Sequence, residues 1–132
     1  MMRNISIIYL SVLLILVVGC SNQDNSIIID GSKIKNVELV NRFYSNIEEN
    51  ESSTLVIENR NGKEGQKSIS KYNFDGTNIS YEVLEPKENQ GFVIVCEKIK
   101  KEDKDNFLTY KLTKCNNTES GKDTISIIKI PK

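Results

Sequence analysis

Hydrophobic residues recur every three or four positions between residues 34 and 47. This spacing is typical of one face of an α-helix, and Asn36 is a residue type that caps a helix N-terminus. We therefore predict an amphipathic helix over residues 36–49 that packs on a sheet; a helix that presents the same face to a partner protein is the alternative. The apolar positions are Ile34, Val37, Val40, Phe43, Tyr44 and Ile47, and the polar ones include Glu38, Asn41, Arg42 and Glu48.

From residue 53 onward the pattern changes to short β-rich runs separated by turn residues. Within residues 77–84, apolar and polar side chains alternate, which indicates a sheet with one buried and one solvent-facing side. The dipeptides Asn61-Gly62 and Asp75-Gly76 are signals for two-residue hairpins. We predict six strands, over residues 54–60, 67–74, 77–84, 92–100, 107–116 and 123–130.

These elements together predict an α+β fold, with one N-terminal amphipathic helix packed on an antiparallel β-meander of five or six strands. The aromatic residues of the strands are expected to be in the core or half-buried rather than to form a stacking surface. They are Tyr72, Phe74, Tyr81, Phe92 and Tyr110.

The N-terminus has the pattern of a bacterial lipoprotein leader. An apolar run of residues 5–18 follows Arg3 and ends in Val17, Val18, Gly19 and Cys20. The run is too short for a membrane-spanning helix, and small residues before a cysteine suit cleavage and acylation. We therefore predict a signal peptide at residues 1–19, cleaved between Gly19 and Cys20; a retained transmembrane anchor is the alternative.

Lipidation of Cys20 with two or three acyl chains would hold the exported chain on the cell membrane, at its extracytoplasmic face. Residues 20–31 are mostly polar and are predicted to form the lipidated cysteine and a flexible tether. Residues 32–132 are then a single domain.

The other two cysteines, Cys96 and Cys115, are predicted to form a disulfide in this oxidising setting. If Asp105 and Asn106 form a two-residue turn, Lys104 faces Phe107 and the same register places the two cysteines opposite each other. Opposed residues of antiparallel strands are close enough for a disulfide.

Composition excludes several functions. The chain has no histidine, which excludes Ser-His and Cys-His hydrolases and histidine-ligated zinc sites. It has 18 basic and 18 acidic side chains, a balance that argues against nucleic-acid binding. No cofactor and no metal are expected.

Two groups of mainly acidic residues are candidate sites. Glu102, Asp103, Asp105 and Asn106 resemble a calcium loop but lack its residue order, so a solvated turn is the preferred interpretation. A carboxylate-dependent cell-wall hydrolase is a distant alternative, because no pattern fixes the separation of its candidate acids. These acids are Glu82, Glu85 and Glu97.

A basic patch is predicted on the paired strands near the disulfide, where Lys100 opposes Lys111. The patch could meet anionic lipid head groups or a wall polymer, but the solvent-facing side of a sheet, balanced by Glu97, Glu102 and Glu119, is the preferred interpretation. Its lysines are Lys98, Lys100, Lys101, Lys111 and Lys114.

Over residues 30–127 the chain resembles a domain-of-unknown-function family of short lipoproteins from Gram-positive bacteria. The resemblance lies in "GSKIKN", "RFYSNIE", "LVIENRNGKEGQKSISKYNFDGTNISYEV", "VCEKIKKE" and "YKLTKC". Where the family has an "EGDPI" turn, this chain reads "KEGQKSI". The resemblance implies export, one domain and a Cys96–Cys115 pair, and it implies no activity.

The sequence therefore predicts a non-catalytic membrane-anchored lipoprotein that binds a protein or envelope component. An inhibitor or immunity-type lipoprotein, which would protect its own cell by occupying a toxin or enzyme, is the alternative.

Overall fold

The computed structural model describes residues 25–62, 65–89, 91–116 and 123–132. The predicted signal peptide and Cys20 lie outside these residues. One sheet contains eight strands in the order β2-β1-β3-β4-β5-β6-β7-β8. The elements are β1 (Ser26–Asp30), β2 (Lys33–Lys35), α2 (Glu38–Glu48), β3 (Ser53–Asn59), β4 (Ser68–Phe74), β5 (Ile79–Glu85), η3 (Lys87–Asn89), β6 (Val93–Lys104), β7 (Phe107–Cys115) and β8 (Ile125–Pro131).

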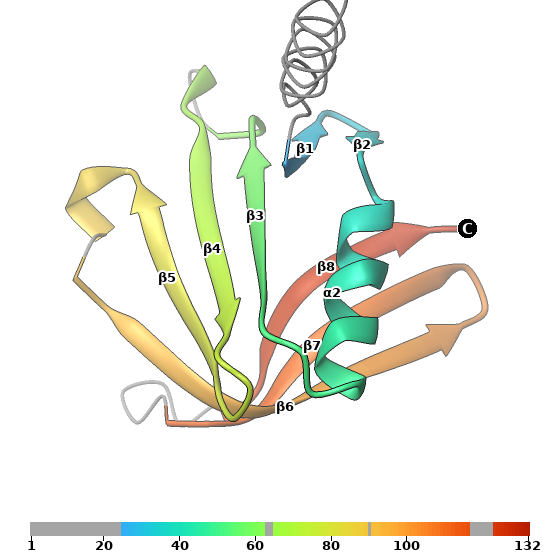
Figure 1. Ribbon diagram of the computed structural model, residues 1–132. Helices are drawn as coiled ribbons and strands as arrows, with labels where there is room; N and C mark the ends of the chain where they lie inside the picture. Colours follow the sequence, from blue (N-terminus) through green and yellow to red (C-terminus); the bar gives the residue numbers. More distant parts are fainter. Residues whose placement is uncertain (1–24, 63–64, 90, 117–122) are drawn as a thin grey trace, which may run out of the picture.

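The predicted α+β class is wrong, because the fold is mostly β. The sheet curls into a half-barrel, and β6, β7 and β8 pass behind α2, the one α-helix of the described residues (Figure 1). Each of the six predicted strands is present. Two further strands, β1 and β2, come before them in the chain, one on each side of the first turn. The sheet is also mixed rather than antiparallel throughout, because β1 runs parallel to β3.

Strand β1 lies in the segment that the sequence analysis assigned to the tether, so that segment ends earlier than predicted. Ile27 is fully buried and pairs with Ile57 of β3. Parallel neighbours need a crossover connection, which β2 and α2 provide. Three consecutive isoleucines, residues 27–29, are typical of a strand between two others, and they are the sequence signal for β1.

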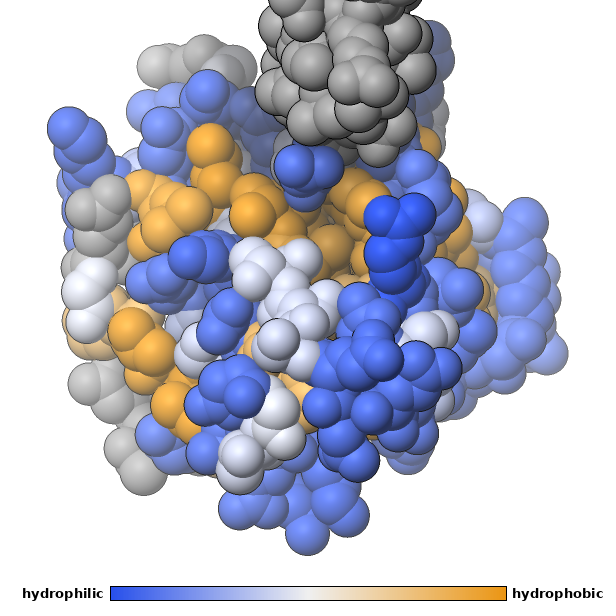
Figure 2. All heavy atoms as spheres, in the orientation of Figure 1, coloured by the Kyte–Doolittle hydropathy of each residue, from blue (hydrophilic) through white to orange (hydrophobic). Residues whose placement is uncertain are grey.

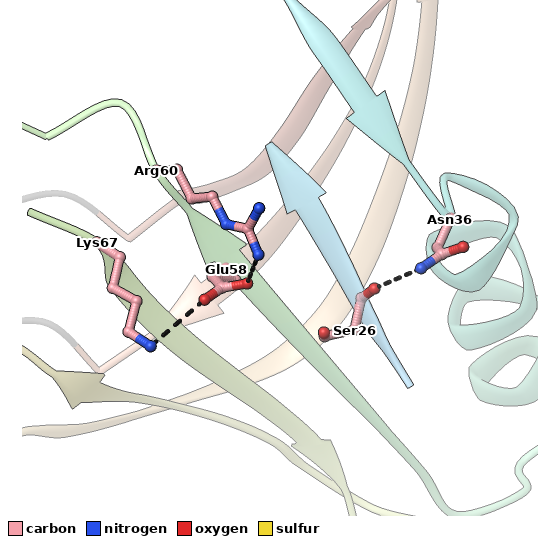
Figure 3. Close-up of polar contacts among 5 residues, drawn as sticks. All are labelled: Ser26, Asn36, Glu58, Arg60 and Lys67. Atoms are coloured by element: carbon pink, nitrogen blue, oxygen red, sulfur yellow. Dashed lines mark hydrogen bonds and ion pairs between the residues drawn. The ribbon is translucent and has the colours of Figure 1, made fainter. Parts of the chain in front are cut away.

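Helix α2 confirms the predicted apolar stripe but not the predicted cap. Val40 and Phe43 are each 1% exposed. Asn36 has a left-handed backbone, with φ of 61°, and makes no cap bond. Its Nδ2 instead donates a hydrogen bond of 3.0 Å to the carbonyl oxygen of Ser26 (Figure 3). Asn36 therefore ties the start of the helix to β1.

The core lies between the concave side of the sheet and α2. Its residues come from α2 and from every strand except β2, and the apolar side chains of β2 and of the helix flanks pack around them. Of the predicted aromatic core, Tyr72, Phe74 and Tyr110 are buried and Tyr81 is half-buried, whereas Phe92 is 65% exposed. The buried residues are Ile27, Val40, Phe43, Leu55, Ile57, Tyr72, Phe74, Ile79, Cys96, Tyr110, Leu112, Ile127 and Ile128.

The β3–β4 connection differs from the predicted two-residue hairpin, since Asn59 pairs with Ser68 and residues 60–67 lie between them. Asn61 is used for a longer-range contact, because its Oδ1 accepts the backbone N–H of Gly31 at 2.6 Å. At the base of this connection, Glu58 forms ion pairs with Arg60 at 3.2 Å and with Lys67 at 3.6 Å (Figure 3).

The turn at Asp75-Gly76 is present, but residues 75–78 form a longer connection than predicted, with Phe74 opposite Ile79. Asp75 Oδ1 accepts the backbone N–H groups of Thr77 and Asn78, both at 2.8 Å. These bonds to Asn78 and Thr77 lower the pKa of Asp75. The side chain thus adds to the backbone hydrogen bond of 3.2 Å from the N–H of Asp75 to the carbonyl oxygen of Asn78, which closes the same turn.

Candidate functional site

The outer side of β6, β7 and β8 carries a cluster of lysines that we call the cationic face. Residues of β6 and β7 that oppose each other share one side of the sheet, and here these pairs are Lys98 with Thr113, Lys100 with Lys111, and Glu102 with Thr109. Lys129 of β8 opposes Thr109 and joins the same side. The face consists of Lys98, Lys100, Lys104, Lys111 and Lys129, with Glu102 among them.

Glu102 lies at the centre of this cluster. Its carboxylate is 3.0 Å from Nζ of Lys111, 3.4 Å from that of Lys100 and 3.9 Å from that of Lys104. The hydrogen bond with Lys111 is the largest cause that lowers the pKa of Glu102, followed by the bond with Lys100. One carboxylate therefore serves three ammonium groups, and the face keeps an excess of positive charge.

The opposite side of the same strands packs on the helix. Tyr110, which is buried, contacts the ring of Tyr44 edge-on, with centroids 5.8 Å apart. Its hydroxyl donates a hydrogen bond of 3.3 Å to Oδ1 of Asn41. Because α2 covers the concave side, the cationic face is the convex, solvent-facing side of the half-barrel (Figure 1).

Lys101 does not belong to the cationic face, contrary to the sequence-based grouping. Its Nζ lies 5.7 Å from the ring centroid of Tyr110 and 5.8 Å from that of Tyr44, on the helix side of the sheet. Strand alternation explains the separation, because neighbouring residues point to opposite sides. Lys114 also departs from regular strand geometry, with a φ of 54°.

Two lysines of the face, Lys104 and Lys129, were not in the predicted basic patch. Lys104 follows the same alternation as Lys98 and Lys100, so a longer β6 would have included it. Lys129 could not be placed, because the β7–β8 register shifts between Tyr110 and Lys111. Its ammonium lies 4.1 Å from the ring centroid of Phe107, which is 39% exposed at the end of the face.

The predicted balance of the patch is only partly found. Glu102 pairs with the lysines, Glu97 alternates away from them along β6, and Glu119 lies outside the described residues.

Figure 2 shows the helix side of the molecule, where hydrophilic residues cover α2 and the tip of the β6–β7 hairpin.

A disulfide between Cys96 and Cys115 fixes one end of the cationic face. The cysteines are directly opposed in the β6–β7 ladder, and every pair of that ladder follows the register set by Lys104 opposite Phe107. Both the predicted disulfide and the predicted turn at Asp105-Asn106 are confirmed. The bond joins residues 19 positions apart, so the hairpin that carries most of the lysines is covalently closed.

The acidic candidates lie apart from one another. Asp103 pairs with Lys132, on the other side of β6 from Glu102. Glu82 lies mid-strand on β5, opposite Lys71 and Val93, and Glu85 ends the same strand. The described residues contain no group of three or more His, Cys, Asp or Glu side chains arranged to hold a metal.

Two of the hollows found among the described residues lie near α2, and one of these reaches the cationic face only at its Lys98 end. One of about 370 Å³ lies between α2 and β3, with Arg42 and Thr54 at its border. Another, of about 230 Å³, lies near the end of α2 and contains Glu48, Glu97 and Lys98. The face itself is therefore a broad surface, which suits an extended charged partner better than a small enclosed ligand.

The sequence matches no protein-family model, no curated protein and no solved structure. Among the residues that the structure describes, no helix has the length and apolar character to cross a membrane.

Proposed function

We propose that this protein is a non-catalytic, lipid-anchored protein of the extracytoplasmic membrane face, and that it binds an anionic partner through the cationic face. The observation that carries the binding part is the segregation of charge: five lysines and one glutamate share one side of three neighbouring strands. The whole chain, by contrast, has equal numbers of basic and acidic side chains. Such an uneven distribution raises the local concentration of anions.

The framework around the face supports binding with little ordering cost. Its lysines stand on strands of a rigid sheet, and the Cys96–Cys115 bond closes the β6–β7 hairpin. A preorganised surface loses less conformational entropy on association than a loop would. The anchoring part rests on the leader sequence and on Cys20.

Cys20→Ala tests the anchor. The variant should move from the membrane fraction to the soluble or secreted fraction, because no acyl chain can then be attached. Fractionation with an antibody against the domain measures this, and metabolic labelling with a fatty-acid analogue should mark the unaltered chain only. A variant that stays in the membrane fraction would show that another segment holds the protein there.

Affinity capture from the native cell envelope tests the binding part. The bait is the domain starting at Ser21, and the comparison is Lys98→Gln/Lys100→Gln/Lys104→Gln, which removes three exposed lysines of the face. The unaltered bait should retain anionic envelope material that the triple variant releases at the same salt concentration. Equal capture by both baits would contradict a role for this face.

Lys33→Gln/Lys35→Gln/Lys87→Gln is the matched control. It removes the same charge from exposed positions on β2 and η3, outside the cationic face. This control should capture as the unaltered bait does.

A further inference from the structure

The cationic face has the shape and charge to lie against a lipid surface. It is convex and lies on the other side of the sheet from α2. Lys98, Lys100 and Lys104 follow one another along β6, and at about 3.3 Å per residue they extend over roughly 20 Å. Lys111 and Lys129, on the next two strands, widen this row. A surface of this kind can contact many head groups at once without a pocket.

The lysines are free enough to reach such a surface. The side chains of Lys104 and Lys100 are 79% and 62% exposed, although both lie within 4 Å of Glu102. Long lysine stems lie along apolar surface while their ammonium groups remain in the polar layer. Phe107, exposed beside Lys129, adds an apolar ring at the end of the face where the interface could take it up.

The position of the predicted lipidation site keeps the domain close to the bilayer. Cys20 precedes Ser26, the first residue of β1, by six positions. Six residues can span at most about 20 Å. A domain of this size is roughly 35 Å across, so a connection of that length is shorter than the domain itself. The domain would stay next to the bilayer and could change mainly its orientation.

We infer that the anionic partner of the cationic face is the anionic lipid surface of the membrane that carries the anchor. The face would turn the anchored domain so that β6, β7 and β8 lie against phosphate head groups and α2 points away. This inference rests on the proposed function, since it names the partner of the same face. Electrostatic attraction to an anionic bilayer decays over a screening length of about 10 Å. The short connection holds the domain beside the bilayer, so the cationic face can come within that distance when the domain turns.

Binding of the unlipidated domain to vesicles tests the inference. All buried core residues lie between Ile27 and Ile128, so the domain starting at Ser21 contains the complete core. Sedimentation with phosphatidylcholine vesicles, with and without phosphatidylglycerol, gives the two affinities. Binding should require phosphatidylglycerol and weaken as salt is raised, because each lysine near an anionic bilayer contributes about a fivefold gain in affinity.

The two triple variants separate the face from overall charge. Lys98→Gln/Lys100→Gln/Lys104→Gln should bind anionic vesicles about 100-fold more weakly. Lys33→Gln/Lys35→Gln/Lys87→Gln, with the same net charge, should keep most of the affinity. An intact disulfide and an unchanged urea midpoint show that both variants are folded.

Three results would overturn the inference: equal binding to vesicles without phosphatidylglycerol, an equal loss in both triple variants, or no vesicle binding at all. If the last occurs while affinity capture still depends on Lys98, Lys100 and Lys104, the proposed function stands and the partner is an envelope polymer or protein. If neither vesicles nor envelope material depend on these lysines, both proposals fail.

Discussion

Phe43→Ala should lower the free energy of unfolding by about 3–5 kcal/mol, a large share of the stability of a domain of this size. Phe43 is 1% exposed and lies on the face of α2 that fills the concave side of the sheet, next to Leu55 of β3. Removing its ring takes apolar surface out of the core and leaves a cavity that a rigid curled sheet cannot close. Urea unfolding followed by circular dichroism measures the change.

Phe92→Ala is the matched control for this substitution. Phe92 is the same residue type but is 65% exposed before the start of β6. Its removal should change the free energy of unfolding by less than about 0.5 kcal/mol. A similar loss in the two variants would contradict the prediction, because the effect would then not depend on the burial of Phe43.

Loss of the Cys96–Cys115 disulfide should cause the second large fall in the stability of the domain. In the chain-entropy account, a loop closed by cysteines 19 positions apart contributes about 3 kcal/mol. Cys96→Ala/Cys115→Ala should therefore lower the melting temperature by about 10 °C or more in a domain of this size. Cys96 is fully buried, so part of the loss in this variant comes from the missing sulfur atom.

Reduction of the unaltered domain separates the covalent bond from the packing of the sulfur. The domain starting at Ser21 has Cys96 and Cys115 as its two cysteines, so thiol titration reports the bond directly. The reduced domain should be less stable than the oxidised one but more stable than the double alanine variant. If reduction leaves the urea midpoint unchanged, the bond does not stabilise the hairpin.

The register of the β6–β7 hairpin was determined by the sequence alone. A two-residue turn at Asp105-Asn106 fixes every later pair along two antiparallel strands, so Cys96 opposite Cys115 followed from counting. The apolar stripe of α2 was equally local, since it depends on spacing within a few turns. Lys100 opposite Lys111, and with it part of the cationic face, came from the same counting.

Longer-range pairing was decided by the tertiary structure. The sequence contains the apolar run of residues 27–29, but only its parallel pairing with β3, across the connection through α2, adds it to the sheet and makes the sheet mixed. Asn36 and Asn61 illustrate the same limit. Their side chains suit a helix cap and a tight turn, but in the folded chain they bind Ser26 and Gly31.

The positions of the lysines in the cationic face were likewise decided partly by the local sequence and partly by long-range strand pairing. Alternation along β6 places Lys98, Lys100 and Lys104 on one side and Lys101 on the other. The spacing of these residues in the sequence predicts this, because side chains of a strand alternate with a period of two. Lys129 joins them because the β7–β8 ladder shifts register after Tyr110. Which side of the sheet faces solvent is decided by α2, since the helix occupies the concave side and leaves the lysines outside.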